Sequence, residues 1–197
     1  MKSATLGLAG VSAVGAGSAG TYWYVTSSKT VQDELTGMKL TSSLKLTQEE
    51  MKSQWQEAFT DDKDAIKAII SGITDDNNGG EALKNWCSSS LSKSPEKSLV
   101  DNVKRWCTVY TVEEKAKRNK KVLLNNESST SDWESVWTKN TDSSKRTKIG
   151  LTGNKEENKK TQDVEAMKKW CDQKRKSEFL AKEKSTVYDV AIEWCSK

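Results

Sequence analysis

Hydrophobic residues recur at helical spacing in several stretches of the chain. Met51, Trp55 and Phe59 are four positions apart, and the preceding Thr47-Gln48-Glu49-Glu50 has the pattern of a capping box. A run of isoleucines from Ile66 to Ile73 has similar spacing and ends at a polar turn rich in Asp, Asn and Gly. These patterns predict two consecutive helices.

Two more amphipathic stripes lie near the second and fourth cysteines. Ser94-Pro95-Glu96 predicts a helix start, with serine as the N-cap and proline at the first helical position. Because every patterned segment has helical period, we expect an all-α fold. The two stripes consist of Leu99, Val103, Trp106 and Tyr110, and of Val187, Val190, Ala191 and Trp194.

The N-terminal segment from Ala4 to Val25 has 22 residues without a charge. About 20 apolar residues are needed to cross a bilayer as a helix, and aromatic residues close this segment where an interfacial belt is expected. Gly17 and Ala19 also fit the small residues of a signal-peptidase site. We therefore expect residues 1–25 to be an uncleaved membrane helix or a cleavable signal segment.

Each of the four cysteines directly follows a tryptophan. Aligning the chain with itself places Trp55 on Trp133, 78 positions apart, and the offset grows to 84 and then 88 at the cysteines. Small loop insertions between two diverged copies of one unit would produce such growth. The four pairs are Trp86-Cys87, Trp106-Cys107, Trp170-Cys171 and Trp194-Cys195.

These correspondences predict two small helical units separated by polar segments. We expect a flexible Ser/Thr-rich tether at 26–46, a first unit at 47–110, a charged connecting segment at 111–127 and a second unit at 128–197. Ser131 would cap the first helix of the second unit. The isoleucine helix has polar counterparts in the second unit, so a loop is expected there, across Thr141 to Thr161.

The cysteines are predicted to form disulfides rather than a metal site. Their number is even, they follow an export-type N-terminus, and their spacings of 20 and 24 match no CxxC motif. A unit that duplicated as a whole was self-sufficient beforehand, so we favour Cys87 with Cys107 and Cys171 with Cys195. Four buried free thiols packed beside tryptophan are the alternative.

The eight tryptophans have two interpretations, core packing and an exposed binding surface. Most of them lie on hydrophobic stripes, so we expect them to be structural. Trp133 and Trp137 are the better candidates for a binding surface, because a polar stretch follows them. The tryptophans expected in the core are Trp55, Trp86, Trp106, Trp170 and Trp194.

Composition removes several classes of function. The chain has no histidine, which excludes an imidazole base and histidine metal ligands. Its 32 basic and 28 acidic residues are interspersed, and the net charge of +4 does not favour a polyanionic partner. We therefore expect no metal, no cofactor and no nucleic acid. No set of residues with the pattern of a catalytic site stands out.

The Gly/Ala-rich N-terminal segment, the length of 197 residues and the repeated Trp-Cys pairs together resemble a known group of proteins. They are similar to the uncharacterised paralogous membrane-anchored surface proteins of haemotropic mycoplasmas. This resemblance implies a cell-membrane location with most of the chain outside the cell, and a protein or host-surface partner. We expect a membrane-tethered interaction or antigenic module. An envelope-associated enzyme that uses Asp/Glu side chains in a helical cleft is the alternative.

Overall fold

The computed structural model describes residues 29–197, and the proposed membrane or signal segment at 1–25 lies outside them. Within the described residues every regular element is helical, and three isolated β-bridges take the place of a sheet. The prediction of an all-α fold is confirmed. No helix in residues 29–197 has both the length and the hydrophobicity to cross a bilayer.

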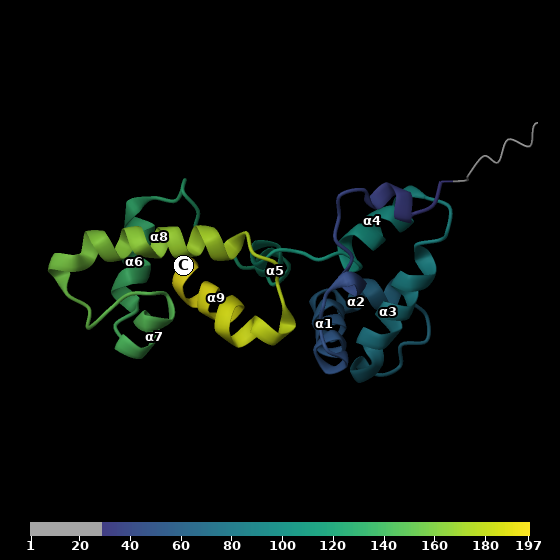
Figure 1. The fold of residues 1–197 in the computed structure, drawn as a ribbon, viewed down its shortest axis with the longest axis horizontal. Coiled ribbons are helices and arrows are strands. Elements are labelled where there is room, and N and C mark those ends of the chain that lie inside the picture. The colour runs from purple at the N-terminus through teal and green to yellow at the C-terminus, as the bar shows by residue number, and fades with distance from the viewer. Residues whose placement is uncertain (1–28) are drawn as a thin grey trace, which may run out of the picture.

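The helices form two groups along the chain, with α5 between them (Figure 1). We call residues 30–110 the first half and residues 111–197 the second half. The first half contains α1 (Gln48–Asp61), α2 (Lys63–Ile69), α3 (Gly79–Ser90) and α4 (Lys97–Trp106). The second contains α5 (Val112–Arg118), α6 (Thr130–Lys139), α7 (Ser143–Lys148), α8 (Lys160–Arg175) and α9 (Asp189–Cys195).

Six short elements join these helices. Five are 3-10 helices and the last is a π-helix that leads directly into α9. In chain order they are η1 (Gln32–Leu35), η2 (Thr41–Ser43), η3 (Asp76–Asn78), η4 (Glu157–Lys159), η5 (Ala181–Glu183) and η6 (Lys184–Tyr188).

Local capping chemistry sets the helix starts. The predicted capping box at Thr47 is confirmed, because its hydroxyl accepts from the Glu50 amide and the Glu50 carboxylate accepts from the Thr47 amide. The other two predicted starts are wrong by two residues. The N-cap of α6 is Ser129, whose hydroxyl accepts from the Asp132 amide. The N-cap of α4 is Glu96.

The stretch predicted as a flexible tether is packed from Thr30 to Leu46, so that prediction is wrong for the described part. Val31 is fully buried and Leu35 nearly so. The backbone of this stretch also bonds to the loop after α3 and to the end of α4. Backbone hydrogen bonds do not depend on a pattern of side chains. The packing of this Ser/Thr-rich stretch could therefore not be predicted from its composition.

The predicted charged connecting segment at 111–127 is a structured part of the second half. Its helix α5 starts at a second capping box, formed by Thr111 and Glu114. Val112, Lys115 and Ala116 lie on one face of α5 and are all buried. The segment that was predicted to connect two units is therefore packed into the second half.

A helix also replaces the loop predicted across Thr141 to Thr161. Helix α7 is capped by the Asp142 carboxylate, which accepts from the Ser144 amide. Its buried residue is Arg146, a charged side chain in a position where a core helix normally has an apolar one. Ile149 is also buried, directly after the helix.

The two halves begin with the same backbone bond. The Val31 amide donates to the Lys93 carbonyl over 2.9 Å, and the Val112 amide donates to the Ser177 carbonyl over 2.9 Å. In each case a valine that follows a threonine bonds to the loop after the helix that carries the first cysteine of that half. The packed segments 30–46 and 111–127 thus occupy corresponding places.

The second cysteine of each half is tied in the same way. The Thr41 amide donates to the Cys107 carbonyl over 2.9 Å, and the Leu124 amide donates to the Cys195 carbonyl over 2.6 Å. A β-bridge lies beside each bond, at the residue that follows the cysteine. Each segment therefore closes its own half against the end of that half's last helix.

Backbone conformation also corresponds between the halves. Gly72 and Gly150, which are 78 positions apart, have φ of 85° and 80°. Gly37 and Lys120 have φ of 80° and 57°, and Lys120 is the one described non-glycine residue with positive φ. Residues with a Cβ rarely adopt such left-handed conformations. The positive φ of Lys120 therefore indicates that the fold of the second half needs a turn at this position.

Candidate functional site

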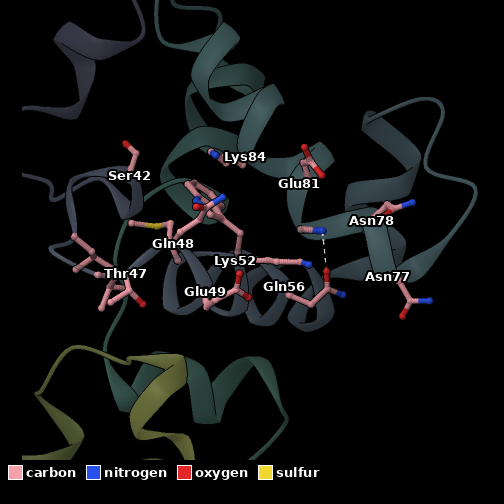
Figure 2. Close-up of a pocket in the computed structure, with 15 residues that line it drawn as sticks. Ser42, Thr47, Gln48, Glu49, Lys52, Gln56, Asn77, Asn78, Glu81 and Lys84 are labelled. Carbon is pink, nitrogen blue, oxygen red and sulfur yellow. Dashed lines mark hydrogen bonds between the residues drawn. The ribbon is translucent and has the colours of Figure 1, made fainter.

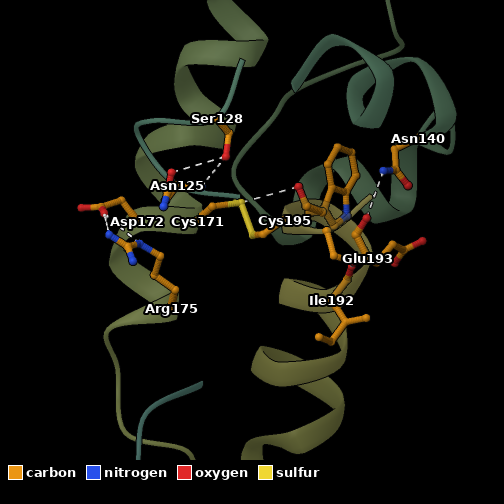
Figure 3. Close-up of a disulfide and its surroundings, with 11 residues drawn as sticks. Asn125, Ser128, Asn140, Cys171, Asp172, Arg175, Ile192, Glu193 and Cys195 are labelled. Carbon is orange, nitrogen blue, oxygen red and sulfur yellow. Dashed lines mark hydrogen bonds and ion pairs between the residues drawn. A yellow bond between two sulfur atoms is a disulfide. The ribbon is translucent and has the colours of Figure 1, made fainter. Parts of the chain in front are cut away.

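Both predicted disulfides are present in the structure. Cys87 of α3 bonds to Cys107 at the end of α4, and Cys171 of α8 bonds to Cys195 of α9 (Figure 3). The Cα atoms of each pair are 5.7 Å apart, a normal disulfide separation. Each bridge joins the two cysteines of one half, and none of the four cysteines is free.

The tryptophans that precede the cysteines divide into two kinds. Trp106 and Trp194 are fully buried, whereas Trp86 and Trp170 are half-buried at the edge of the core. Trp86 packs edge-on against Trp106 with the ring centroids 5.7 Å apart. All four residues therefore contribute to packing around the bridges.

Trp133 and Trp137 are not on a binding surface, and that prediction is wrong. Each is only 1% exposed. The Trp137 indole N–H donates to the Asp163 carboxylate over 2.9 Å, and the Lys155 ammonium lies 4.2 Å from the centroid of the Trp137 ring. The polar stretch after these tryptophans folds back over them, which the sequence pattern did not reveal.

A buried ion pair completes the core of the second half. The Arg146 guanidinium donates to the Asp163 carboxylate over 2.6 Å and also to the Gly153 carbonyl over 3.3 Å. Arg146 is 0% exposed. A buried charge must be paired, so these two residues depend on each other.

A second buried cluster joins the two halves. Lys115 of α5 is 2% exposed, and its ammonium lies 2.8 Å from the Glu57 carboxylate and 2.5 Å from the Asp61 carboxylate of α1. The Tyr110 hydroxyl donates to Asp61 over 2.9 Å. Lys184 of η6 lies 2.7 Å from the other oxygen of Glu57. The charges of the cluster are therefore balanced by one another.

The pKa values in this cluster favour its charged pairs. Burial alone would raise the pKa of Glu57, but hydrogen bonds from Lys115 and Lys184 outweigh it and lower the pKa below its usual value. The bond to Glu57 raises the pKa of Lys184. Burial, reinforced by the charge of Asp61, raises the pKa of Tyr110 well above 10.0.

Polar and aromatic contacts surround the cluster. The Gln54 side chain donates to the Phe179 carbonyl over 3.2 Å and accepts from the Ala181 amide over 2.7 Å. The rings of Phe179 and Tyr110 stack with centroids 5.6 Å apart. These contacts lie around the Lys115–Asp61 pair, in which both side chains are 2% exposed, and the low local dielectric strengthens that pair. The cluster holds the two halves together and leaves no unpaired carboxylate to act as a base.

A groove of about 740 Å³ lies beside α1 and α3 (Figure 2). It presents side chains of both charges next to hydroxyl and amide groups, above a floor that includes Met51 and Trp55. A groove of this kind suits a polar ligand or peptide with both charges rather than a purely apolar molecule. Its charged residues are Glu49, Lys52, Glu81 and Lys84.

Gln56 and Gly80 fix the inner end of this groove. The side-chain Oε1 of Gln56 accepts from the Gly80 backbone amide over 3.0 Å, and its Nε2 donates to the Asp76 backbone carbonyl over 2.8 Å. A Cβ at Gly80 would lie 2.7 Å from the Gln56 backbone nitrogen. Glycine is required here because α1 and α3 approach too closely for any side chain.

Sequence reasoning missed the charged residues that matter most to the structure. Lys115 was predictable, since it shares a helical face with Val112 and Ala116 and that spacing places it inward. No comparable sequence pattern indicates that Arg146 is buried, because its neighbours in α7 are polar. In the described residues no group of His, Cys, Asp and Glu side chains forms a metal site.

Fold and site together define an all-helical protein with one disulfide in each half and an ion cluster between the halves. Comparisons with protein-family models, with curated proteins and with solved structures found no match.

Proposed function

We propose that this chain is a membrane-tethered, extracytoplasmic surface protein that acts as an interaction or antigenic module. The observation that carries the proposal is that all four cysteines form disulfides. Disulfides persist in oxidising surroundings and are rare in the cytosol. The proposal places most of the chain outside the cell and groups it with the haemotropic mycoplasma surface proteins that it resembles.

We also propose that the two halves are diverged copies of one unit. The matched bonds at Val31 and Val112, the matched bonds at the cysteines and the paired left-handed turns support this origin. They also suggest copy boundaries near Thr30 and Thr111 rather than at 47 and 128. Each copy would then carry its own closing segment and its own bridge.

The proposed anchor lies close in sequence to the packed domain. Residues 26–29 alone separate residues 1–25 from Thr30, where the packed chain begins. Four residues span at most about 14 Å when fully extended. The first half would therefore be held near the membrane surface, with the second half further along the chain.

The groove beside α1 and α3 is the candidate binding surface for a partner, because its polar rim and mixed charge fit a protein segment. The structure gives the alternative, a carboxylate enzyme, less support. Glu57 and Asp61, two carboxylates that share the Lys115 ammonium, are both engaged by lysines. An acid/base pair needs at least one of them free to exchange a proton with substrate.

Protease treatment of intact cells tests the location. The exposed Lys120-Lys121 pair between α5 and α6 is an accessible trypsin site. We expect trypsin to cleave the chain on intact cells, while a cytoplasmic marker protein stays whole. A chain that is degraded only after lysis would contradict the proposal.

A further inference from the structure

Within one chain, α1 of the first half packs against a surface of the second half. That surface combines α5 with the stretch from Phe179 to η6. Asp61 pairs with Lys115 at its centre, and Gln54 bonds to the backbone of Phe179 and Ala181 at its edge. This contact is an example of a helix from one half that binds to a surface of the other half.

Among residues 29–197, no helix packs onto the corresponding surface of the first half. It forms a shallow hollow of about 320 Å³ between η1 and α4. The matched backbone bonds at the start of the halves place Glu34 where Lys115 lies in the second half. The matched loops after α3 and α8 place Lys97 at the position of Ala181. The hollow is lined by Glu34, Pro95, Lys97, Val100, Asp101 and Lys104.

The helix that corresponds to α1 also has a free face. The offset of 78 that relates Trp55 to Trp133 places Lys139 of α6 at the position of Asp61 and Asp132 at that of Gln54. Lys139 is exposed, and the Asp132 side chain is 24% exposed and lies 2.7 Å from the Lys197 ammonium at the end of the chain.

The charges on these two free surfaces are complementary. In the internal contact an aspartate on the helix meets a lysine on the receiving surface. In the free pair of surfaces both signs are reversed, with Lys139 on the helix and Glu34 in the hollow. Asp132 and Lys97 would form a second pair of opposite charge. Opposite charges at matched positions favour this docking over others.

We propose that copies of this chain associate head to tail, with α6 of one copy docked in the hollow of the next. The inference rests on the proposed correspondence of the two halves. Helices α4 and α6 lie in different lobes of the chain, with α5 between them (Figure 1), and residues of α4 line the hollow. A second copy therefore supplies the helix.

Head-to-tail contacts leave one free hollow and one free α6 at the ends of every assembly. Such heterologous association is open-ended, so the assemblies lengthen with concentration instead of stopping at a dimer. The contacts are polar and lie at the surface, so raising the ionic strength from 0.1 M to about 1 M should screen them.

Sedimentation velocity of the full chain in a mild detergent tests the proposal over a range of concentrations. We expect the average mass to rise with concentration at low salt. Glu34→Lys and Lys139→Glu should each weaken association about tenfold, since each turns an attraction into a repulsion. The double variant should recover most of the lost association. Glu127→Lys, an exposed charge reversal outside both surfaces, is the matched control.

Three outcomes would overturn the inference. The first is a protein that stays monomeric at every concentration. The second is association that both single charge reversals leave unchanged, which is the result that contacts through the N-terminal segment would give. The third is a double variant no better than the single ones, with circular dichroism showing that all of them fold. Protease treatment of intact cells tests the surface location separately, so failure of the association experiment would not contradict the proposed location.

Discussion

Replacing Lys115 by Met should destabilise the protein by about 3 to 5 kcal/mol, the usual penalty for removing one partner of a buried ion pair. Lys115 and the Asp61 side chain are each 2% exposed and lie 2.5 Å apart. Without the ammonium, the Asp61 carboxylate stays buried with the Tyr110 hydroxyl as its remaining donor. Methionine has a similar length, so little of the loss would come from a cavity.

Urea denaturation at pH 7, followed by tryptophan fluorescence, measures this loss of unfolding free energy. Lys117→Met is the control, because Lys117 is exposed and pairs only with Glu113 along the same helix. Exposed pairs of this kind contribute about 0.3 to 0.5 kcal/mol. The control should therefore remain close to the unmodified protein.

A double variant separates an unpaired charge from a simple loss of packing. Adding Asp61→Asn to Lys115→Met removes the uncompensated carboxylate while the amide oxygen can still accept from Tyr110. We expect the double variant to be more stable than Lys115→Met by at least about 1 kcal/mol. The reasoning is refuted if Lys115→Met loses less than about 1 kcal/mol, or if Asp61→Asn deepens the loss.

Three further predictions concern other parts of the fold. Arg146→Met should cost about 3 to 5 kcal/mol in urea unfolding by leaving Asp163 buried and unpaired, whereas Lys148→Met on the exposed face should cost under about 0.5 kcal/mol. Gly80→Ala should cost about 1 to 3 kcal/mol by forcing α1 and α3 apart, and an unchanged denaturation midpoint would contradict the close approach. Folding lowers the pKa of Glu57, so its contribution to the free energy of unfolding is present above about pH 4.5 and is lost as the pH falls further. Between about pH 5 and pH 3, the free energy of unfolding should therefore decline less steeply in Glu57→Gln than in the original protein.

Those parts of the fold that follow from side-chain periodicity were predictable. Thr47 and the hydrophobic spacing after it specify α1, and the repeated Trp-Cys pairs favoured the cysteine pairing that the structure has. Both signals arise from local chemistry or from sequence repetition, which a single sequence displays directly.

Other parts depend on tertiary contacts that leave no such pattern. The segment after Thr30 packs through backbone bonds to Lys93 and Cys107, and its Ser/Thr content is typical of a loop. Arg146 lies in a short helix of polar residues and is buried because Asp163 neutralises it. A charge in a sequence normally indicates a solvated face, so burial by pairing is invisible until the partners are known.

The most direct test of the central claim, a disulfide-stabilised protein that works outside the cytoplasm, is the state of its cysteines in the living cell. Cells are treated with a membrane-permeant alkylating reagent before lysis, and the protein is then digested and mapped without reduction. The account predicts cross-linked peptides that join Cys87 to Cys107 and Cys171 to Cys195, with no alkylated cysteine. Four alkylated cysteines would contradict it.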